Sequence, residues 1–288
     1  METTKTGNAE LVEAREILPG EWQLAFHARH LAAGARAGQY VHLDPADAGG
    51  VLRRPLAINT ADAATGTVTL VVAAHDGRRR GPPLGLRPGD RLDLHGPLGR
   101  PFEVDGRSHH LLLLAEGRAV TRLRMLVDEA LAAGRQVTLL FGADSARDVY
   151  PSSLLPDEVE YVVATRDGSI GVPGELGDLV PEYESWADQA FAAGPWPMLA
   201  TLARLARTRR TRLGVATLGR KRGAGRPDPA GSPLARRKAF LQVALDQRIG
   251  CAAAVCLGCA VIGGGGTPLR VCRDGPVFAS DELEWEPE

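Results

Sequence analysis

Hydrophobic positions follow two different periods along this chain, and the change comes near residue 107. Before it, short β-branched or alternating runs at 39–43, 68–72 and 91–95 are separated by turns rich in Gly, Pro and Asp. Such runs are typical of short antiparallel strands. The pattern therefore predicts an all-β first domain over residues 1–106, folded as an antiparallel barrel or sandwich.

After residue 107 the chain alternates between buried strands and amphipathic helices. Apolar residues recur at helical spacing over 120–131 and 198–205. Strands that alternate with helices indicate a Rossmann-like parallel sheet, with a nucleotide-sized crevice at its carboxyl edge. We expect this α/β domain over residues 107–207, with strands at 109–115, 136–141, 160–164 and 189–192.

The formal net charge of −1 conceals a strongly basic stretch, because 207–238 holds eleven Lys or Arg residues and one acid, Asp228. A basic stretch could contact nucleic acid, but this one has no aromatic side chain for base stacking. Its Gly and Pro content favours a solvated linker over 208–238. The sequence therefore predicts no nucleic-acid partner.

All four cysteines lie near the end of the chain. Cys251, Cys256 and Cys259 are spaced C-x4-C-x2-C, and Cys272 follows. This is the spacing of a plant-type [2Fe-2S] loop. A four-cysteine zinc site usually shows two C-x2-C pairs, whereas this segment has one, so zinc is the weaker alternative. We expect residues 239–288 to form an iron–sulfur module.

The remaining features concern the cellular compartment of the protein. The first residues lack a signal-peptide pattern, and no apolar run reaches the 18 or so residues that span a bilayer. Cysteines crowded into one segment also fit a reducing compartment better than a disulfide framework. We expect a cytoplasmic protein with no membrane association.

Several motifs in one order carry a family resemblance. Arg54-Pro55-Leu56-Ala57 lies in the β region, 96–99 reads Gly-Pro-Leu-Gly, and 194–198 reads Gly-Pro-Trp-Pro-Met. The cysteine motif is then followed by Asp-Gly-Pro-Val-Phe at 274–278. With Asp-Gly-Ser at 167–169, this order resembles the ferredoxin-reductase superfamily, and within it the electron-transfer subunits of NAD-dependent dihydroorotate dehydrogenase.

The resemblance implies a β-barrel flavin domain, a subunit carrying FAD and one [2Fe-2S] cluster, and a role in pyrimidine biosynthesis. It also implies exchange of electrons with NAD(H), and a catalytic partner subunit that holds FMN and assembles with this one as a heterotetramer. The four cysteines would be the cluster ligands. The FAD-lining positions implied are Arg54, Pro55, Leu56 and Ala57 on one strand and Val71, Val72 and Ala73 on a second.

The chain departs from the family pattern where a pyridine nucleotide would bind. In place of a glycine-rich turn ending in proline it has Ala-Glu116-Gly-Arg118-Ala119, with Arg122 at the proline position. Glycines there let backbone N–H groups approach a pyrophosphate. Glu116 instead brings a side chain and a negative charge, which Arg118 or Arg122 could offset.

Smaller departures occur elsewhere. Ala193 stands where the family places a cysteine beside the nicotinamide, and Val72 and Ala73 replace an aromatic residue and an arginine on the flavin strand. Ala252 and Ala254 replace glycines in the cluster loop. These features predict an intact cluster site, a partial flavin site and an eroded NAD(H) site.

No residue has the setting of a general acid or base, so we assign no catalytic side chain. Arg248, Arg270 and Arg273 flank the cysteines and could offset cluster charge. Two other functions stay open: a reductase subunit serving a hydrogenase or a ferredoxin:NADP oxidoreductase, and a non-catalytic partner that kept the cysteines, possibly with zinc, but lost nucleotide binding.

Overall fold

A computed structural model describes residues 5–43, 54–73, 85–212, 238–251 and 253–285. Most of the predicted linker therefore lies outside the described residues. In the part that is described, helix α4 (Trp196–Arg212) continues beyond the expected linker start at residue 208. No helix in the described ranges is long and apolar enough to cross a bilayer.

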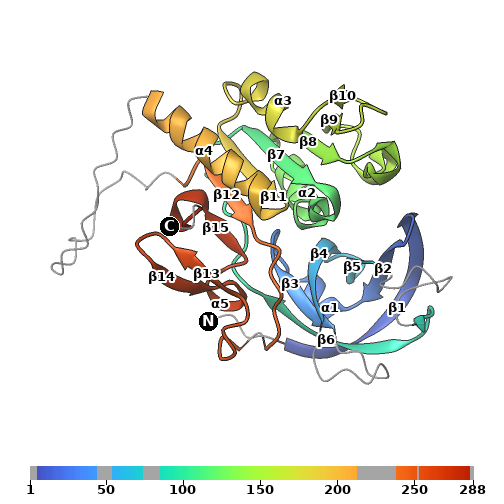
Figure 1. The fold of residues 1–288 in the computed structure, drawn as a ribbon. Coiled ribbons are helices and arrows are strands. Elements are labelled where there is room, and N and C mark those ends of the chain that lie inside the picture. The colour runs from blue at the N-terminus through green and yellow to red at the C-terminus, as the bar shows by residue number, and fades with distance from the viewer. Residues whose placement is uncertain (1–4, 44–53, 74–84, 213–237, 252, 286–288) are drawn as a thin grey trace.

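The first domain is a closed antiparallel barrel (Figure 1), which is one of the two folds that the alternating pattern predicted and the one that the resemblance implied. Val68, Leu70 and Val72 point inward from one strand while the residues between them are half-buried, which is the period-2 pattern of a strand with one buried face. A single turn of helix, α1 (Arg29–Ala32), follows the second strand. The barrel order is β1-β2-β5-β4-β3-β6, with bounds β1 (Lys5–Leu18), β2 (Glu21–His27), β3 (Tyr40–Leu43), β4 (Arg54–Asp62), β5 (Thr67–Ala73) and β6 (Arg91–Leu98).

A seven-stranded sheet forms the second layer, in the order β10-β9-β8-β7-β11-β12-β15. Its strands are parallel except for β15, which pairs antiparallel with β12 at one edge. The expected strands are all present, and the sheet also takes two strands from beyond residue 239. The bounds are β7 (His110–Glu116), β8 (Gln136–Ala143), β9 (Glu160–Thr165), β10 (Val172–Pro173), β11 (Gln189–Ala193), β12 (Leu241–Ala244) and β15 (Val277–Ala279).

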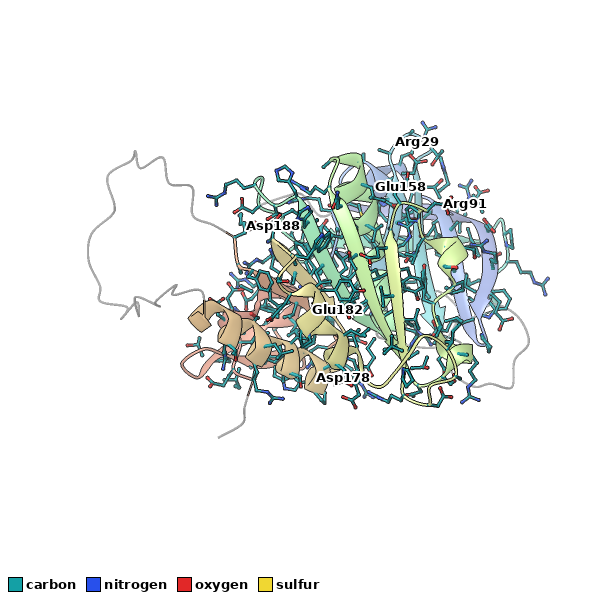
Figure 2. The ribbon with its side chains drawn as sticks, turned by 90° about the horizontal axis from the view of Figure 1, so that it is seen from above. Arg29, Arg91, Glu158, Asp178, Glu182 and Asp188 are labelled. Carbon is teal, nitrogen blue, oxygen red and sulfur yellow. The ribbon has the colours of Figure 1, made fainter. Side chains whose placement is uncertain are left out.

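Helices cover this sheet. The expected helix over 120–131 is divided into a 3-10 turn, η2 (Gly117–Arg122), and α2 (Arg124–Ala132). A further helix, α3 (Leu176–Tyr183), begins with a capping box between Glu175 and Asp178. Figure 2 shows Asp178 at the start of α3 and Asp188 just before β11 at opposite ends of the sheet. Minor 3-10 turns are η3 (Ala146–Asp148), η4 (Ser152–Leu154) and η5 (Ser280–Glu282).

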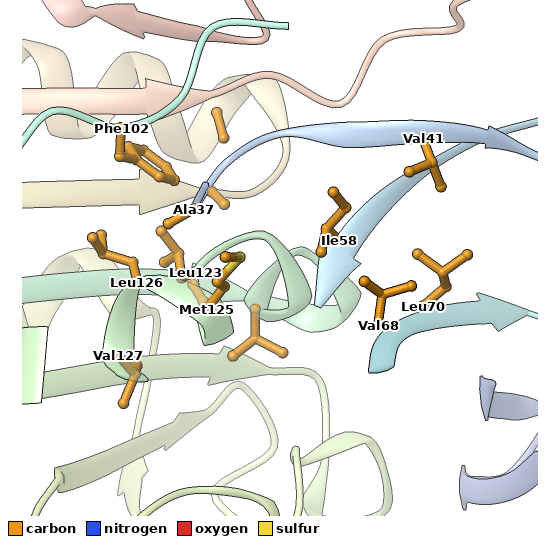
Figure 3. Close-up of a cluster of buried hydrophobic side chains, with 14 of the residues drawn as sticks. Ala37, Val41, Ile58, Val68, Leu70, Phe102, Leu123, Met125, Leu126 and Val127 are labelled. Carbon is orange, nitrogen blue, oxygen red and sulfur yellow. The ribbon is translucent and has the colours of Figure 1, made fainter. Parts of the chain in front are cut away.

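One hydrophobic core joins the barrel to the sheet domain. Val41 and Ile58 of the barrel belong to the same buried cluster as Leu123 and Leu126 of the α2 region, and Phe102 of the connection packs among them (Figure 3). Because the cluster is continuous, the barrel and the sheet share one apolar interior. Strand β4 therefore meets η2 and α2 at the junction.

The segment 260–274 lies at the edge of the sheet and beside the barrel (Figure 1). A hairpin of β13 (Ala260–Gly263) and β14 (Thr267–Arg270) leads into a helical turn, α5 (Val271–Asp274). The glycines at 263–266 lie at the turn of this hairpin. The acidic end of the described chain is packed: Trp285 is 4% exposed and its ring lies 4.7 Å from that of Trp196.

Candidate cofactor sites

The four cysteines are reduced and lie in two pairs. The Cys272 backbone N–H donates to Cys259 Sγ at 3.5 Å, and both side chains are buried. Cys251 interacts with Cys256 through a side-chain hydrogen bond. The C-x4-C half of the motif thus supplies one pair of thiols, and the third and fourth cysteines supply the other.

This pairing discriminates between metals. Among the described residues, no three His, Cys, Asp or Glu side chains converge as one mononuclear site requires. A tetrahedral zinc site needs four ligands around one point, whereas a cluster of two irons takes two thiolates on each. Two neighbouring pairs of thiols match the two thiolates that each iron of a two-iron cluster takes.

The two pairs differ in their electrostatics. Backbone N–H groups of Cys256, Val255 and Ala253 stabilise the Cys251 thiolate and lower its pKa to about 6. Burial, with the neighbouring Cys259, raises the pKa of Cys272 to about 11. A coordinating metal ion would deprotonate such a thiol outright, so metal binding would convert Cys272 to a thiolate.

The loop between the cysteines turns through left-handed backbone. Ala254 has φ of +60° and Leu257 has φ of +56°. L-residues other than glycine rarely adopt this conformation, which costs about 1–2 kcal/mol. The loop therefore keeps a glycine-like path with an alanine at 254; Ala252 lies outside the described residues.

The three arginines expected beside the cluster are placed differently. Arg270 forms an ion pair with Asp274, with Nε and Oδ2 3.5 Å apart. Arg248 and Arg273 are exposed. Arg270 is thus already neutralised within the chain, which weakens its expected role in offsetting cluster charge.

The expected flavin residues lie on adjacent barrel strands. Pairing of Ile58 with Leu70 aligns β4 with β5, so the segments 54–57 and 71–73 lie toward the same end of the paired strands. All seven side chains are half-buried except Val72, which is 5% exposed. Strand β4 also contacts η2 at the junction between barrel and sheet. Six of the seven side chains are therefore partly open to solvent, and the assignment of these seven positions to FAD stays a prediction.

A cleft of ≈ 680 Å³ lies at the carboxyl ends of β7, β8 and β9, where the parallel sheet predicted a nucleotide crevice. Glu116 ends β7, and its carboxylate Oε1 accepts a hydrogen bond from Arg166 Nη2 at 2.7 Å. Arg166 also contacts Asp144, with Nη1 and Oδ1 2.9 Å apart. Burial raises the pKa of Glu116, although the positive charge of Arg166 opposes the shift.

Each described arginine that lines this cleft already has an acidic partner. Arg118 Nε lies 3.3 Å from Glu21 Oε1 of the barrel, and Arg147 Nε lies 3.6 Å from Asp148 Oδ2. Arg118 therefore does not offset Glu116, contrary to one expectation. An incoming pyrophosphate would have to displace a carboxylate to gain a cation.

A second cleft of ≈ 280 Å³ adjoins the first and shares Glu116. Beside this cleft, Arg122 Nη2 lies 2.5 Å from Asp246 Oδ1. The second arginine expected to offset the charge of Glu116 is therefore also paired with an acid. Ala193 ends β11 as a buried residue paired with Ala115 and Ala244. The position where the family has a cysteine is therefore methyl-lined and enclosed.

Sequence reasoning missed two residues in these sites. Arg166 is separated from Glu116 by fifty positions, and only its place after a parallel strand could have marked it. Tyr40 of β3 donates its hydroxyl to the Cys272 carbonyl oxygen at 3.2 Å. No signal in the sequence links a barrel tyrosine to a cysteine loop so far along the chain.

Comparison with known proteins agrees with this geometry. Residues 246–284 match the family model of the iron–sulfur cluster binding domain of dihydroorotate dehydrogenase B. The chain is 28% identical to the dihydroorotate dehydrogenase B (NAD(+)) electron transfer subunit of Desulforamulus reducens, over 98% of this chain and all of that protein. It is also 28% identical to the subunit of the same name from Geobacillus thermodenitrificans, over 95% of this chain and 96% of that protein.

Solved structures give the same fold. A structure of NADH-dependent reduced ferredoxin-NADP oxidoreductase, studied for flavin-based electron bifurcation, matches with a TM-score of 0.73 and 22% identity over 99% of this chain and 92% of that one. A ferredoxin reductase of carbazole 1,9a-dioxygenase matches at 0.58 and 20% identity over 70% of this chain and 65% of that one. These comparisons confirm the resemblance: over nearly its full length, this chain is similar to electron transfer subunits of dihydroorotate dehydrogenase B.

Proposed function

We propose that this chain is an electron-transfer subunit that carries FAD and a [2Fe-2S] cluster and serves a catalytic dihydroorotate dehydrogenase subunit. The observation that carries the proposal is the arrangement of four reduced cysteines as two neighbouring pairs, within the segment that matches a cluster-binding domain. Full-length similarity to electron transfer subunits supports the rest.

The chain's own residues have defined parts in this function. Cys251 and Cys256 would hold one iron, and Cys259 and Cys272 the other. The segments 54–57 and 71–73 would contact FAD, with the Arg54 guanidinium available to a phosphate. When bound, the flavin exchanges electrons in pairs or singly and the cluster exchanges them singly, while the protein orients both and excludes side reactions.

A catalytic partner follows from this role. We infer an FMN-containing partner subunit, a heterotetrameric assembly, and a cytoplasmic place in pyrimidine biosynthesis, on the strength of the named relatives. We also infer that the protein makes no stable contact with nucleic acid. Isolation of the complex from the native host, with the partner identified by mass spectrometry, tests all of these points.

The proposal does not extend to rapid reaction with a pyridine nucleotide. Glu116 occupies the turn that would receive a pyrophosphate, and Arg118, Arg122 and Arg166 each hold a carboxylate. Binding of a dinucleotide would require burying its charge beside Glu116 or breaking an ion pair, and both cost free energy. We therefore propose that another carrier exchanges electrons with this subunit.

Anaerobic reduction of the purified holoprotein tests this function. Dithionite should bleach both the flavin and the cluster absorption, whereas NADH at millimolar concentration should leave them unreduced over minutes. Rapid bleaching by NADH would contradict the proposed loss of pyridine-nucleotide reactivity. Absence of any flavin absorption would contradict the proposed FAD site.

A further inference from the structure

Tyr40 belongs to the barrel by sequence but to the C-terminal segment by contact. Its neighbour Val41 points into the barrel core. Tyr40 is instead buried in a second hydrophobic cluster, together with Cys259, Cys272 and Val271. Successive side chains of a strand point to opposite faces. Strand β3 therefore faces the barrel with one side and the cysteine segment with the other.

The same face of the barrel carries part of the expected flavin strand. Tyr40 is paired directly with Ala57 of β4. Residues paired across antiparallel strands project from the same side of the sheet. The Tyr40 ring thus stands beside one of the positions expected to line FAD, on the surface that meets the cluster loop.

Two features hold the Tyr40 side chain in place. The side chain is 2% exposed, and its hydroxyl donates to the Cys272 carbonyl oxygen at 3.2 Å. Gly99 leaves room for the ring, because a Cβ at that position would lie 2.9 Å from Tyr40 Cε1 and 2.4 Å from Pro276 Cδ. The next residue, Arg100, donates its N–H to the Gly275 carbonyl oxygen at 2.6 Å. The barrel and the residues that directly follow it therefore contact the chain within α5 and just after it.

We propose that Tyr40 is a positioning residue that fixes the Cys272 arm of the cluster loop against the flavin-bearing strand. The proposal rests on the cluster site proposed above. It adds a specific claim: one hydroxyl, donated from the barrel to the backbone of a ligand cysteine, sets both the rigidity of that arm and the electrostatic field at the bound cluster.

The effect on the cluster has a definite sign. The hydroxyl hydrogen carries partial positive charge and points toward the peptide of Cys272. Hydrogen-bond donors near a cluster favour its more negative, reduced form and raise its potential. Removing the donor should therefore lower the midpoint potential of the bound cluster.

The test compares Tyr40→Phe with Tyr161→Phe. Tyr161 offers a matched control because its hydroxyl also donates to a backbone carbonyl, that of Tyr150 at 2.9 Å, in the sheet domain away from the cysteines. Both variants lose one oxygen atom and keep the ring. Hydrogen exchange of the cofactor-free proteins should show amides of 259–274 exchanging about three- to tenfold faster in Tyr40→Phe, with 136–143 unchanged as an internal reference.

The loaded proteins provide the second readout. Tyr40→Phe should bind iron with a midpoint potential below that of the wild type, or fail to bind iron that Tyr161→Phe still binds. Equal exchange in the two variants, or an unchanged potential in fully loaded Tyr40→Phe, would overturn the proposal. If exchange rises in Tyr40→Phe while the wild type itself takes up no iron, the proposed function fails and the positioning contact stands.

Discussion

Glu116 and Arg166 form a 2.7 Å hydrogen-bonded ion pair across the cleft at the carboxyl edge of the parallel sheet. Arg166 is also held by Asp144 and lies 3.7 Å from Glu175. The arginine is thus bound to acids of the chain itself, in the cleft where a phosphate would be expected.

Replacing Glu116 by Gln should make the protein less sensitive to pH. Burial raises the pKa of Glu116 above 4.5, so the folded state binds a proton that the unfolded state has already released. The contribution of Glu116 to stability is therefore present below about pH 4.5 and is lost as pH rises through the raised pKa. Glu116→Gln should unfold at the same temperature as the wild type below pH 4 and at a higher one at pH 7, by calorimetry.

Asp62→Asn provides a control of opposite sign. Hydrogen bonds from Thr65 and the Ala64 backbone lower the pKa of Asp62, so its contribution is present above the ordinary value of 3.8 and is lost as pH falls. Asp62→Asn should therefore be less stable than the wild type at pH 7. Parallel pH curves for the wild type and Glu116→Gln would contradict the placement of Glu116.

Replacing Glu116 by Gly should improve pyridine-nucleotide binding. The change removes a unit negative charge and a side chain from the turn, and it releases Arg166 from one of its three acidic partners. One unit charge about 4 Å from another is worth ~1 kcal/mol even in water, so we expect NAD⁺ to bind at least about fivefold more tightly, measured by calorimetric titration.

Asp144→Asn is a control that removes a negative charge near Arg166 without changing the shape of the turn. It removes an exposed acid that contacts the same Arg166 but leaves the turn unchanged, so its gain in affinity should be smaller. Equal affinities for the wild type and Glu116→Gly would show that Glu116 does not exclude the nucleotide.

Replacing Ala254 by Gly should stabilise the cluster loop. Ala254 has φ of +60°, and glycine adopts this conformation without the penalty of about 1 kcal/mol that alanine incurs. Ala253 does not have positive φ, so Ala253→Gly should instead lose up to about 1 kcal/mol through backbone entropy. Chemical unfolding of the cofactor-free variants measures the difference, and a loss of stability in Ala254→Gly would refute the strain.

Replacing Trp285 by Ala should be strongly destabilising. The ring is 4% exposed, packs on Trp196 and donates its Nε1–H to the Ser280 carbonyl oxygen at 2.6 Å. Removal of such a buried ring costs about 3–5 kcal/mol. Trp186→Ala, which removes a half-buried ring stacked on His110, should cost clearly less in denaturant unfolding; equal losses would mean that the chain end does not pack as described.

Local patterns predicted much of this fold. The period-2 runs located barrel strands, and the buried run at 109–115 located β7. Both predictions succeeded because a few adjacent residues are enough to show the burial pattern of a strand. The helix α3 was not expected: it holds Pro181 and begins at a capping box of two acids. The packed end at Trp285 was also missed, since a segment rich in acids gives no local sign of a partner indole.

The candidate sites divide in the same way. The cysteine motif lies within 22 consecutive positions, so spacing alone identified it. The ion pair of Glu116 with Arg166 and the contact of Tyr40 with Cys272 join residues that are far apart in sequence. Such contacts depend on which strands become neighbours, and no local pattern specifies that.

Iron and acid-labile sulfide, measured on protein purified without oxygen, test the central claim most directly. The account predicts about two iron and two sulfide per chain, no bound zinc, and loss of both elements when Cys272 is replaced by Ser. A preparation with one zinc per chain, or with neither iron nor sulfide, would contradict it.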